Sequence, residues 1–127
     1  MFPLGVFGLG GAAERLLLPA SRQVPSVEAV AGSDPAADRR GWAAEKYGIR
    51  TYESAAELLE KEKPALALIG TPPDSHFDLT RMALEAGAHV FLEKPFTETV
   101  EEADALIALA RERGKLLAVN TQYRYMD

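Results

Sequence analysis

The stretch LGVFGLGGAA, residues Leu4–Ala13, decides the fold. Its apolar first half is typical of a buried strand, and the residues that follow fit the pattern G-x-G-x-x-A through Gly8, Gly10 and Ala13. Gly8 permits a tight turn, Gly10 lets the backbone approach a pyrophosphate, and Ala13 allows the next helix to pack closely on the strand. A glycine-rich turn can also exist without a ligand, so its meaning depends on the rest of the chain.

Apolar and amphipathic segments alternate along the whole sequence. Because the apolar segments are short and the segments between them are helical in pattern, we expect parallel strands joined by right-handed crossovers. The prediction is an α/β fold, a doubly wound six-stranded Rossmann sheet with the order 3-2-1-4-5-6 and helices on both faces. The expected strands are Leu4–Gly8, Val27–Ser33, a short edge strand at Ile49–Tyr52, Ala65–Thr71, His89–Lys94 and Leu116–Thr121.

The helical segments have recognisable ends. Ser54 and Thr99 each precede a glutamate by three residues, which predicts capping boxes. Gly48, Gly87 and Gly114 follow helical runs, at positions where a left-handed residue is favoured.

Two helices carry further expectations. Pro19 lies inside AERLLLPAS, so the first helix should kink or end there. The last helix should bury one apolar stripe, made of Val100, Ala103, Leu106, Ile107 and Ala110.

Composition limits the class of protein. The 127 residues suffice for one domain, and a net charge of −5 argues against a general nucleic-acid binder. The absence of cysteine excludes a disulfide framework and thiolate metal sites, and we predict no metal site. No apolar run is long enough to span a membrane, and the start MFPLGVFGLG lacks the basic region of a signal peptide. A cytoplasmic location is therefore expected.

The second predicted strand leads into Asp34. In the predicted fold its carboxylate can accept hydrogen bonds from the adenosine ribose and would repel a 2′-phosphate, which favours NAD over NADP. Arg39 and Arg40 follow but are expected to lie within the next helix. The alternative is that Asp34 merely caps that helix, and the two roles are compatible.

The fourth predicted strand ends in the turn GTPPDSHF. Thr71 supplies a small polar group, and Pro72 and Pro73 stiffen the turn into a flat wall. Ser75, or the aspartate before it, can cap the next helix. His76 falls in the first turn of that helix, where a structural hydrogen bond is the more common role and contact with a cofactor is the alternative.

The fifth predicted strand ends in Glu93, Lys94 and Pro95. With this strand order the nicotinamide end of a dinucleotide would lie toward the fourth and fifth strands, so Lys94 is the best catalytic candidate for proton exchange with a substrate oxygen. The alternative is a solvated lysine at a strand end. After the last strand, Asn120 and Arg124 could line the same cleft, or Arg124 could pair with a surface acid.

Taken together, GLGGAAERLLLPA, GSDP, TPPDSHFDLTRMALEAGAHVFLEKPF and VNTQYRY resemble the Gfo/Idh/MocA oxidoreductase family from about Leu4 to Arg124. The resemblance implies an NAD- or NADP-dependent enzyme that acts on sugars, cyclitols or related hydroxy compounds. It implies a nucleotide loop at Gly8, Gly10 and Ala13, and Lys94 as the catalytic lysine. The predicted cofactor-binding residues are Gly8, Leu9, Gly10, Gly11, Ala12, Asp34, Thr71, Pro72, Pro73, His76, Glu93, Lys94 and Asn120.

The family has a second, substrate-binding domain that we expect to be absent from these residues, which assigns residues 1–127 to the dinucleotide-binding domain. On its own, this domain is expected to bind the cofactor weakly, to lack useful catalysis, and to expose apolar surface that favours self-association. Other readings are a non-catalytic module that senses NAD, a site for another adenine nucleotide such as coenzyme A, and non-redox chemistry with NAD.

Overall fold

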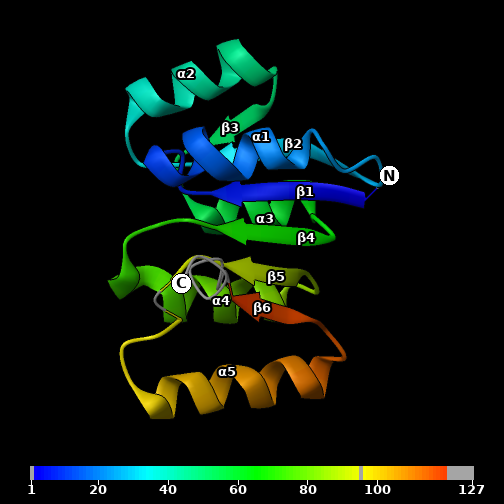
Figure 1. Ribbon diagram of the computed structural model, residues 1–127, viewed down its shortest axis with the longest axis vertical. Coiled ribbons are helices and arrows are strands. Elements are labelled where there is room, and N and C mark those ends of the chain that lie inside the picture. The colour runs from blue at the N-terminus through cyan, green and yellow to red at the C-terminus, as the bar shows by residue number, and fades with distance from the viewer. Residues whose placement is uncertain (1, 95, 120–127) are drawn as a thin grey trace, which may run out of the picture.

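The computed structural model, which describes residues 2–94 and 96–119, contains a six-stranded parallel sheet with helices on both faces (Figure 1). The strand order is β3-β2-β1-β4-β5-β6, so the predicted fold class and strand order are confirmed. The strands are β1 Phe2–Phe7, β2 Val27–Ser33, β3 Arg50–Tyr52, β4 Leu66–Ile69, β5 His89–Leu92 and β6 Leu117–Val119.

Two helical layers cover the sheet. One contacts β2 and β3, and the other contacts the strands from β3 across to β5. Figure 1 shows α1 in front of the sheet with α3 and α4 behind it. The first layer is the π-helical turn η1 Ala13–Leu17, α1 Leu18–Ser21 and α2 Ala37–Tyr47. The second is α3 Ala55–Glu62, the 3-10 turn η2 Pro73–Ser75, α4 His76–Glu85 and α5 Val100–Arg113.

The register of the sheet aligns the carboxyl ends of its strands. Phe7, the last residue of β1, pairs with Ser33 of β2 and Ile69 of β4, and Ile69 pairs with Leu92 of β5. The next residues along the chain, Gly8, Asp34, Gly70 and Glu93, therefore form one row across the sheet. Strand order reverses between β1 and β4, which is where parallel sheets of this kind bind ligands.

The first helix accommodates Pro19 without ending there. The five residues before α1 form a π-helical turn, and the helix continues past Pro19 to Ser21. A wider turn is a reasonable response to proline, which lacks the N–H of an α-helical bond and crowds the carbonyl four residues earlier. Of the two alternatives expected at Pro19, a kink or an end, the structure has a distorted helix that continues to Ser21.

The caps of α3 and α5 are largely as predicted. Ser54 and Thr99 accept hydrogen bonds from the N–H groups of Glu57 and Glu102 at 3.2 and 3.1 Å. Glu102 reaches back to the N–H of Glu98 rather than to that of Thr99. Left-handed φ angles occur at the three predicted glycines, Gly48, Gly87 and Gly114.

The buried side of α5 differs from the predicted stripe. Leu106 and Ala110 are buried, but Val100 is 72% exposed and Ile107 is 43% exposed. Leu109, which the prediction omitted, packs against the core instead. The predicted stripe was too wide. Val100 and Ile107 lie on one side of the helix, about 100° from the direction of Leu106, and that side is exposed.

Apolar surface is exposed elsewhere too. An apolar groove of about 280 Å³ lies between α1 and the sheet and is lined mainly by aliphatic side chains and Phe91. Phe2 and Leu116 are 61% and 74% exposed. Within the described residues, no helix is both long and apolar enough to cross a membrane.

Candidate functional site

The glycine loop begins immediately after β1. Gly8 has a φ of +94°, and its N–H donates to the carbonyl of Ser33 at 2.9 Å. A Cβ at Gly8 would lie 2.9 Å from Cγ2 of Thr71 and 3.0 Å from the backbone of Gly70, so only glycine fits without strain. A Cβ at Gly10 would meet nothing within 4 Å. The loop is therefore packed tightly on β4 at Gly8 and open at Gly10.

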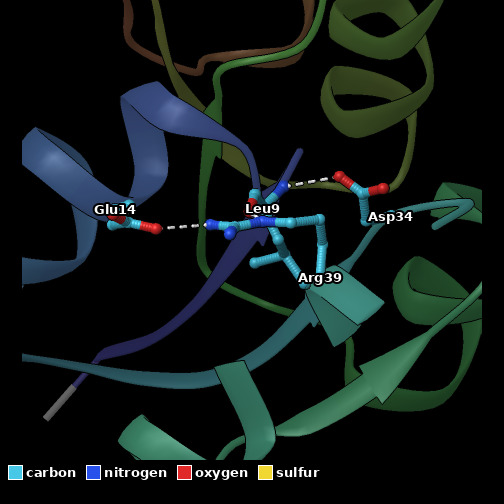
Figure 2. Close-up of polar contacts among 4 residues, drawn as sticks. All are labelled: Leu9, Glu14, Asp34 and Arg39. Atoms are coloured by element: carbon cyan, nitrogen blue, oxygen red, sulfur yellow. Dashed lines mark hydrogen bonds and ion pairs between the residues drawn. The ribbon is translucent and has the colours of Figure 1, made fainter. Parts of the chain in front are cut away.

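Leu9 anchors the loop through its side chain and its backbone. The side chain is fully buried against Gly32, where a Cβ would approach Leu9 to 2.8 Å. Its N–H donates to Oδ2 of Asp34 at 2.8 Å, and its carbonyl accepts from Nε of Arg39 at 2.6 Å. Figure 2 shows the bond from Leu9 to Asp34, with the Arg39 side chain passing beside Leu9. Both polar backbone groups of Leu9 are thus engaged by the protein.

Asp34 binds the glycine loop and does not cap α2. Its Oδ1 accepts from the N–H of Ala36 at 2.8 Å, but Ala36 is itself the N-cap of α2 and has no side-chain cap. Its Oδ2 reaches Leu9, 25 residues earlier. A carboxylate has about four acceptor positions, and these two bonds leave capacity for ribose hydroxyls.

Arg39 and Arg40 lie in α2 as expected, but their side chains reach back to the strand ends. Arg39 contacts Leu9 and pairs with Glu14 at 2.8 Å (Figure 2), and Arg40 donates to the carbonyls of Asp34 and Pro35 at 2.9 Å. The sequence pattern predicts only that both arginines lie within this helix and assigns them no role in the site. Their position in the first turns of a helix that starts beside Asp34 was the available signal.

The turn after β4 is held by its own side chains. The Ser75 hydroxyl contacts Oγ1 of Thr71 at 2.6 Å and the Pro72 carbonyl at 2.7 Å. Ser75 is the N-cap residue of α4, yet its side chain makes no cap bond, so the capping prediction for it is wrong. His76 is fully buried, with Nε2 at 2.8 Å from the Thr71 carbonyl. That geometry fits the structural role, and direct contact with a cofactor stays a prediction.

Glu93 and Lys94 follow β5 directly. The N–H of Glu93 donates to the carbonyl of Ile69 at 2.9 Å, and its Cγ would lie 3.9 Å from a Cβ at Gly70. Glu93 is thus beside the end of β4, whereas the Lys94 side chain is exposed. Asn120 and Arg124 lie outside the described residues.

Residues that follow the ends of four strands, β1, β2, β3 and β4, line a cavity of about 320 Å³. It brings together Gly8, Asp34, Thr71 and Pro72, and its wall also includes Glu53 and Ser75. The other predicted cofactor-binding residues that the structure describes are outside its lining: Leu9, Gly10, Gly11, Ala12, Pro73, His76, Glu93 and Lys94. The volume is at the lower end of small-molecule pockets, which suits a nucleoside rather than a whole dinucleotide. The tight turn at Gly8 and the carboxylate of Asp34 at one wall fit the adenosine half of such a cofactor.

A charged network holds β3, whose Tyr52 carbonyl accepts from the N–H of Asp34 at 3.1 Å. Arg50 donates to Glu62 through two nitrogens, at 2.6 and 2.7 Å, and Tyr52 also donates to Glu62. The hydrogen bond from Arg50 lowers the pKa of Glu62, and the hydrogen bond to Glu62 raises the pKa of Tyr52. The network joins β3 to α3, and its three side chains are outside the lining of the cavity.

Comparison with known proteins places this geometry in a family. Residues 2–121 match the model of the Gfo/Idh/MocA family, described as an oxidoreductase family with an NAD-binding Rossmann fold. The chain is 37% identical over 117 residues to dTDP-3,4-didehydro-2,6-dideoxy-alpha-D-glucose 3-reductase of Streptomyces violaceoruber, covering 92% of this chain and 34% of that protein. It is 32% identical over 123 residues to D-glucoside 3-dehydrogenase of Escherichia coli (strain K12), covering 96% and 35%.

Solved structures agree with the relatives. A 3-ketoreductase from Actinomadura kijaniata in complex with NADP and TDP-benzene superposes with a TM-score of 0.88 at 35% identity, covering 94% of this chain and 37% of that one. An NAD-binding protein from Listeria innocua gives a TM-score of 0.90 at 35% identity, covering 98% and 36%. The chain spans about a third of the length of these proteins. It belongs to the Gfo/Idh/MocA oxidoreductase family and corresponds to its NAD-binding Rossmann domain.

Proposed function

We propose that this chain is the cofactor-binding domain of an NAD(P)-dependent oxidoreductase that acts on a sugar, a cyclitol or a related hydroxy compound. The observation that carries the proposal is the cavity in which Gly8, Asp34 and Thr71 meet from three separate strand ends. A bound nicotinamide cofactor would supply the hydride acceptor or donor. The adenosine would lie against Asp34, and Gly10 to Ala12 would face the pyrophosphate.

Lys94 is the proposed catalytic residue. It lies one residue past Glu93 in the row of strand ends, on the β5 side of the switch point, and outside the cavity proposed for adenosine. Its amine would give a proton to, or take one from, the substrate oxygen while the hydride moves at the neighbouring carbon. The names of the two relatives, a sugar 3-reductase and a D-glucoside 3-dehydrogenase, are in keeping with a reaction at a hydroxyl-bearing carbon.

The cofactor preference follows from opposing charges. Asp34 favours NAD, because its carboxylate would repel a 2′-phosphate. Arg40 lies at the backbone of Asp34 and Pro35, so cations are closer to the ribose position than the sequence pattern indicated. NAD is the proposed cofactor and NADP the second. Self-association through the exposed apolar side chains and a cytoplasmic location are further proposals.

A titration of NADH into the 127-residue chain tests the proposal. Trp42 is the single tryptophan, so energy transfer from its fluorescence to the reduced nicotinamide reports binding. We expect saturable binding that Asp34→Ala weakens about tenfold or more, since hydrogen bonds from hydroxyls to a carboxylate are lost. Asp38→Ala removes the same charge from the exposed face of α2 and should change affinity by no more than about twofold.

Three outcomes discriminate between functions. Absence of saturable NADH binding would contradict the proposal. Equal affinity for NADH and for ADP would favour a site for adenine nucleotides in general. NADPH titrated in parallel should lose less affinity than NADH in Asp34→Ala, because the substitution also relieves repulsion of the 2′-phosphate.

A further inference from the structure

The carbonyl of Leu9 is held by a side chain from a distant helix. Nε of Arg39 donates to it at 2.6 Å across 30 residues of sequence, while Asp34 holds the N–H of the same residue. Because the Leu9 side chain is fully buried, the residue is fixed at three points. Figure 2 shows Leu9 between the two charged side chains.

The orientation of the Leu9 carbonyl also sets the orientation of the Gly10 N–H, because the two groups share one trans peptide unit. The carbonyl of Leu9 and the N–H of Gly10 belong to one planar unit and point in opposite directions. A carbonyl fixed toward Arg39 therefore aims the Gly10 N–H away from α2. Gly10 is also the loop residue at which a Cβ would meet nothing within 4 Å, so the space beside its Cα is open.

The guanidinium of Arg39 is itself held in place. Its second nitrogen contacts Glu14 at 2.8 Å, and its Cζ lies 4.4 Å from the centre of the Trp42 ring. The side chains of Arg39 and Glu14 are 29% and 46% exposed, so their ion pair contributes little to stability on its own. What the pair does is fix the direction from which Nε meets the Leu9 carbonyl.

We propose that Arg39 is a positioning residue for pyrophosphate binding, which acts by orienting the peptide between Leu9 and Gly10. This inference rests on the proposed function, because it assigns a task to the loop of that same site. Arg39 need not touch the cofactor. Its bond to Leu9 holds the Gly10 N–H in the orientation that a phosphate needs, so the loop does not have to reorganise when the phosphate binds.

The affinity difference between ADP and AMP isolates this effect. Both ligands share the adenosine and one phosphate, so their ratio of affinities measures what the second phosphate adds. We expect Arg39→Ala to lower that ratio about tenfold, the value of one hydrogen bond to a charged group, while AMP affinity changes by no more than about twofold. General damage to the fold would weaken both ligands alike.

Arg39→Gln separates positioning from charge. The glutamine amide nitrogen stands at the same number of bonds from the backbone as Nε of arginine, so it can donate to Leu9 without a positive charge. We expect Arg39→Gln to keep most of the ADP-to-AMP ratio. Arg113→Ala, at the end of α5, is the control for loss of one charge and should leave the ratio unchanged.

Amide NMR on the 127-residue chain measures both affinities. The titrations are done at about 0.5 M ionic strength, where the Debye length is below about 5 Å, so that the charge lost in each variant has little long-range effect on binding. An unchanged ratio in Arg39→Ala, or equal losses in the Ala and Gln variants, would overturn the positioning role alone. Failure of the unchanged chain to bind either nucleotide would overturn the proposed function and this inference together.

Discussion

Gly8 and Gly10 offer a paired test of the glycine loop, because an added methyl group should act in opposite ways at the two positions. At Gly8, alanine must adopt a φ of +94°, which costs about 1–3 kcal/mol. Its Cβ would also meet the fixed backbone of Gly70 at 3.0 Å, and such overpacking costs about another 1–3 kcal/mol. The reduced freedom of the unfolded chain returns about 0.4–1 kcal/mol.

Gly8→Ala should therefore lower the free energy of unfolding by about 1–6 kcal/mol. Gly10 has no left-handed φ and space for a Cβ, so Gly10→Ala should leave stability unchanged or raise it by about 0.4–1 kcal/mol. The same methyl would project where the pyrophosphate must approach the backbone, and NADH affinity should fall about tenfold or more.

Urea unfolding followed by Trp42 fluorescence measures the first effect, and NADH titration measures the second. The slope of unfolding free energy against urea should stay constant, which shows that the unfolded state is unchanged. A Gly8→Ala variant as stable as the parent would refute the packing argument. A Gly10→Ala variant that binds NADH as tightly as the parent would refute the assignment of the open loop to the cofactor.

Two further predictions concern catalysis and pH. In the full-length enzyme, Lys94→Met should lower turnover at least about a hundredfold, which is the usual effect of losing a general acid or base, with little change in cofactor affinity. The control Lys61→Met, on the exposed side of α3, should change neither turnover nor cofactor affinity. The hydrogen bond from Arg50 lowers the pKa of Glu62 in the folded protein. The ionised Glu62 therefore stabilises the fold fully above the ordinary glutamate pKa of about 4.3, and this stabilisation is lost as the pH falls through the lower pKa of Glu62 in the folded state. Urea midpoints between about pH 5 and pH 2 should fall less steeply for Glu62→Gln than for the parent, and parallel slopes would contradict this assignment.

The sheet and the positions of its strand ends could be predicted from the sequence because they depend on local patterns. Short apolar runs separated by helical segments give the parallel sheet, and parallel strands leave their carboxyl ends at one edge. Gly8, Asp34 and Thr71 each follow such a run, so their convergence could be predicted before any side chain was placed. The registers of β1, β2 and β4 supply the physical reason, since these strands end level with one another.

The contacts that orient the loop could not be read in the same way. Arg39 meets Leu9 across 30 residues, and the direction of a long side chain depends on packing rather than on local sequence. The sequence pattern places Arg39 and Arg40 within a helix, and that position alone does not indicate which backbone groups their side chains reach. The hydroxyl of Ser75 shows the same limit, because a good capping residue used its bond on Thr71 instead.

The central claim is that one row of strand ends forms a dinucleotide site, with adenosine on one side of the switch point and the reactive end on the other. A crystal structure of the 127-residue chain with bound NADH tests it most directly. We expect ribose hydroxyls on the Asp34 carboxylate, a phosphate oxygen at the Gly10 N–H, and the nicotinamide on the side of Lys94. A cofactor bound away from the cavity of Gly8, Asp34 and Thr71, or bound there in the reverse direction, would contradict the account.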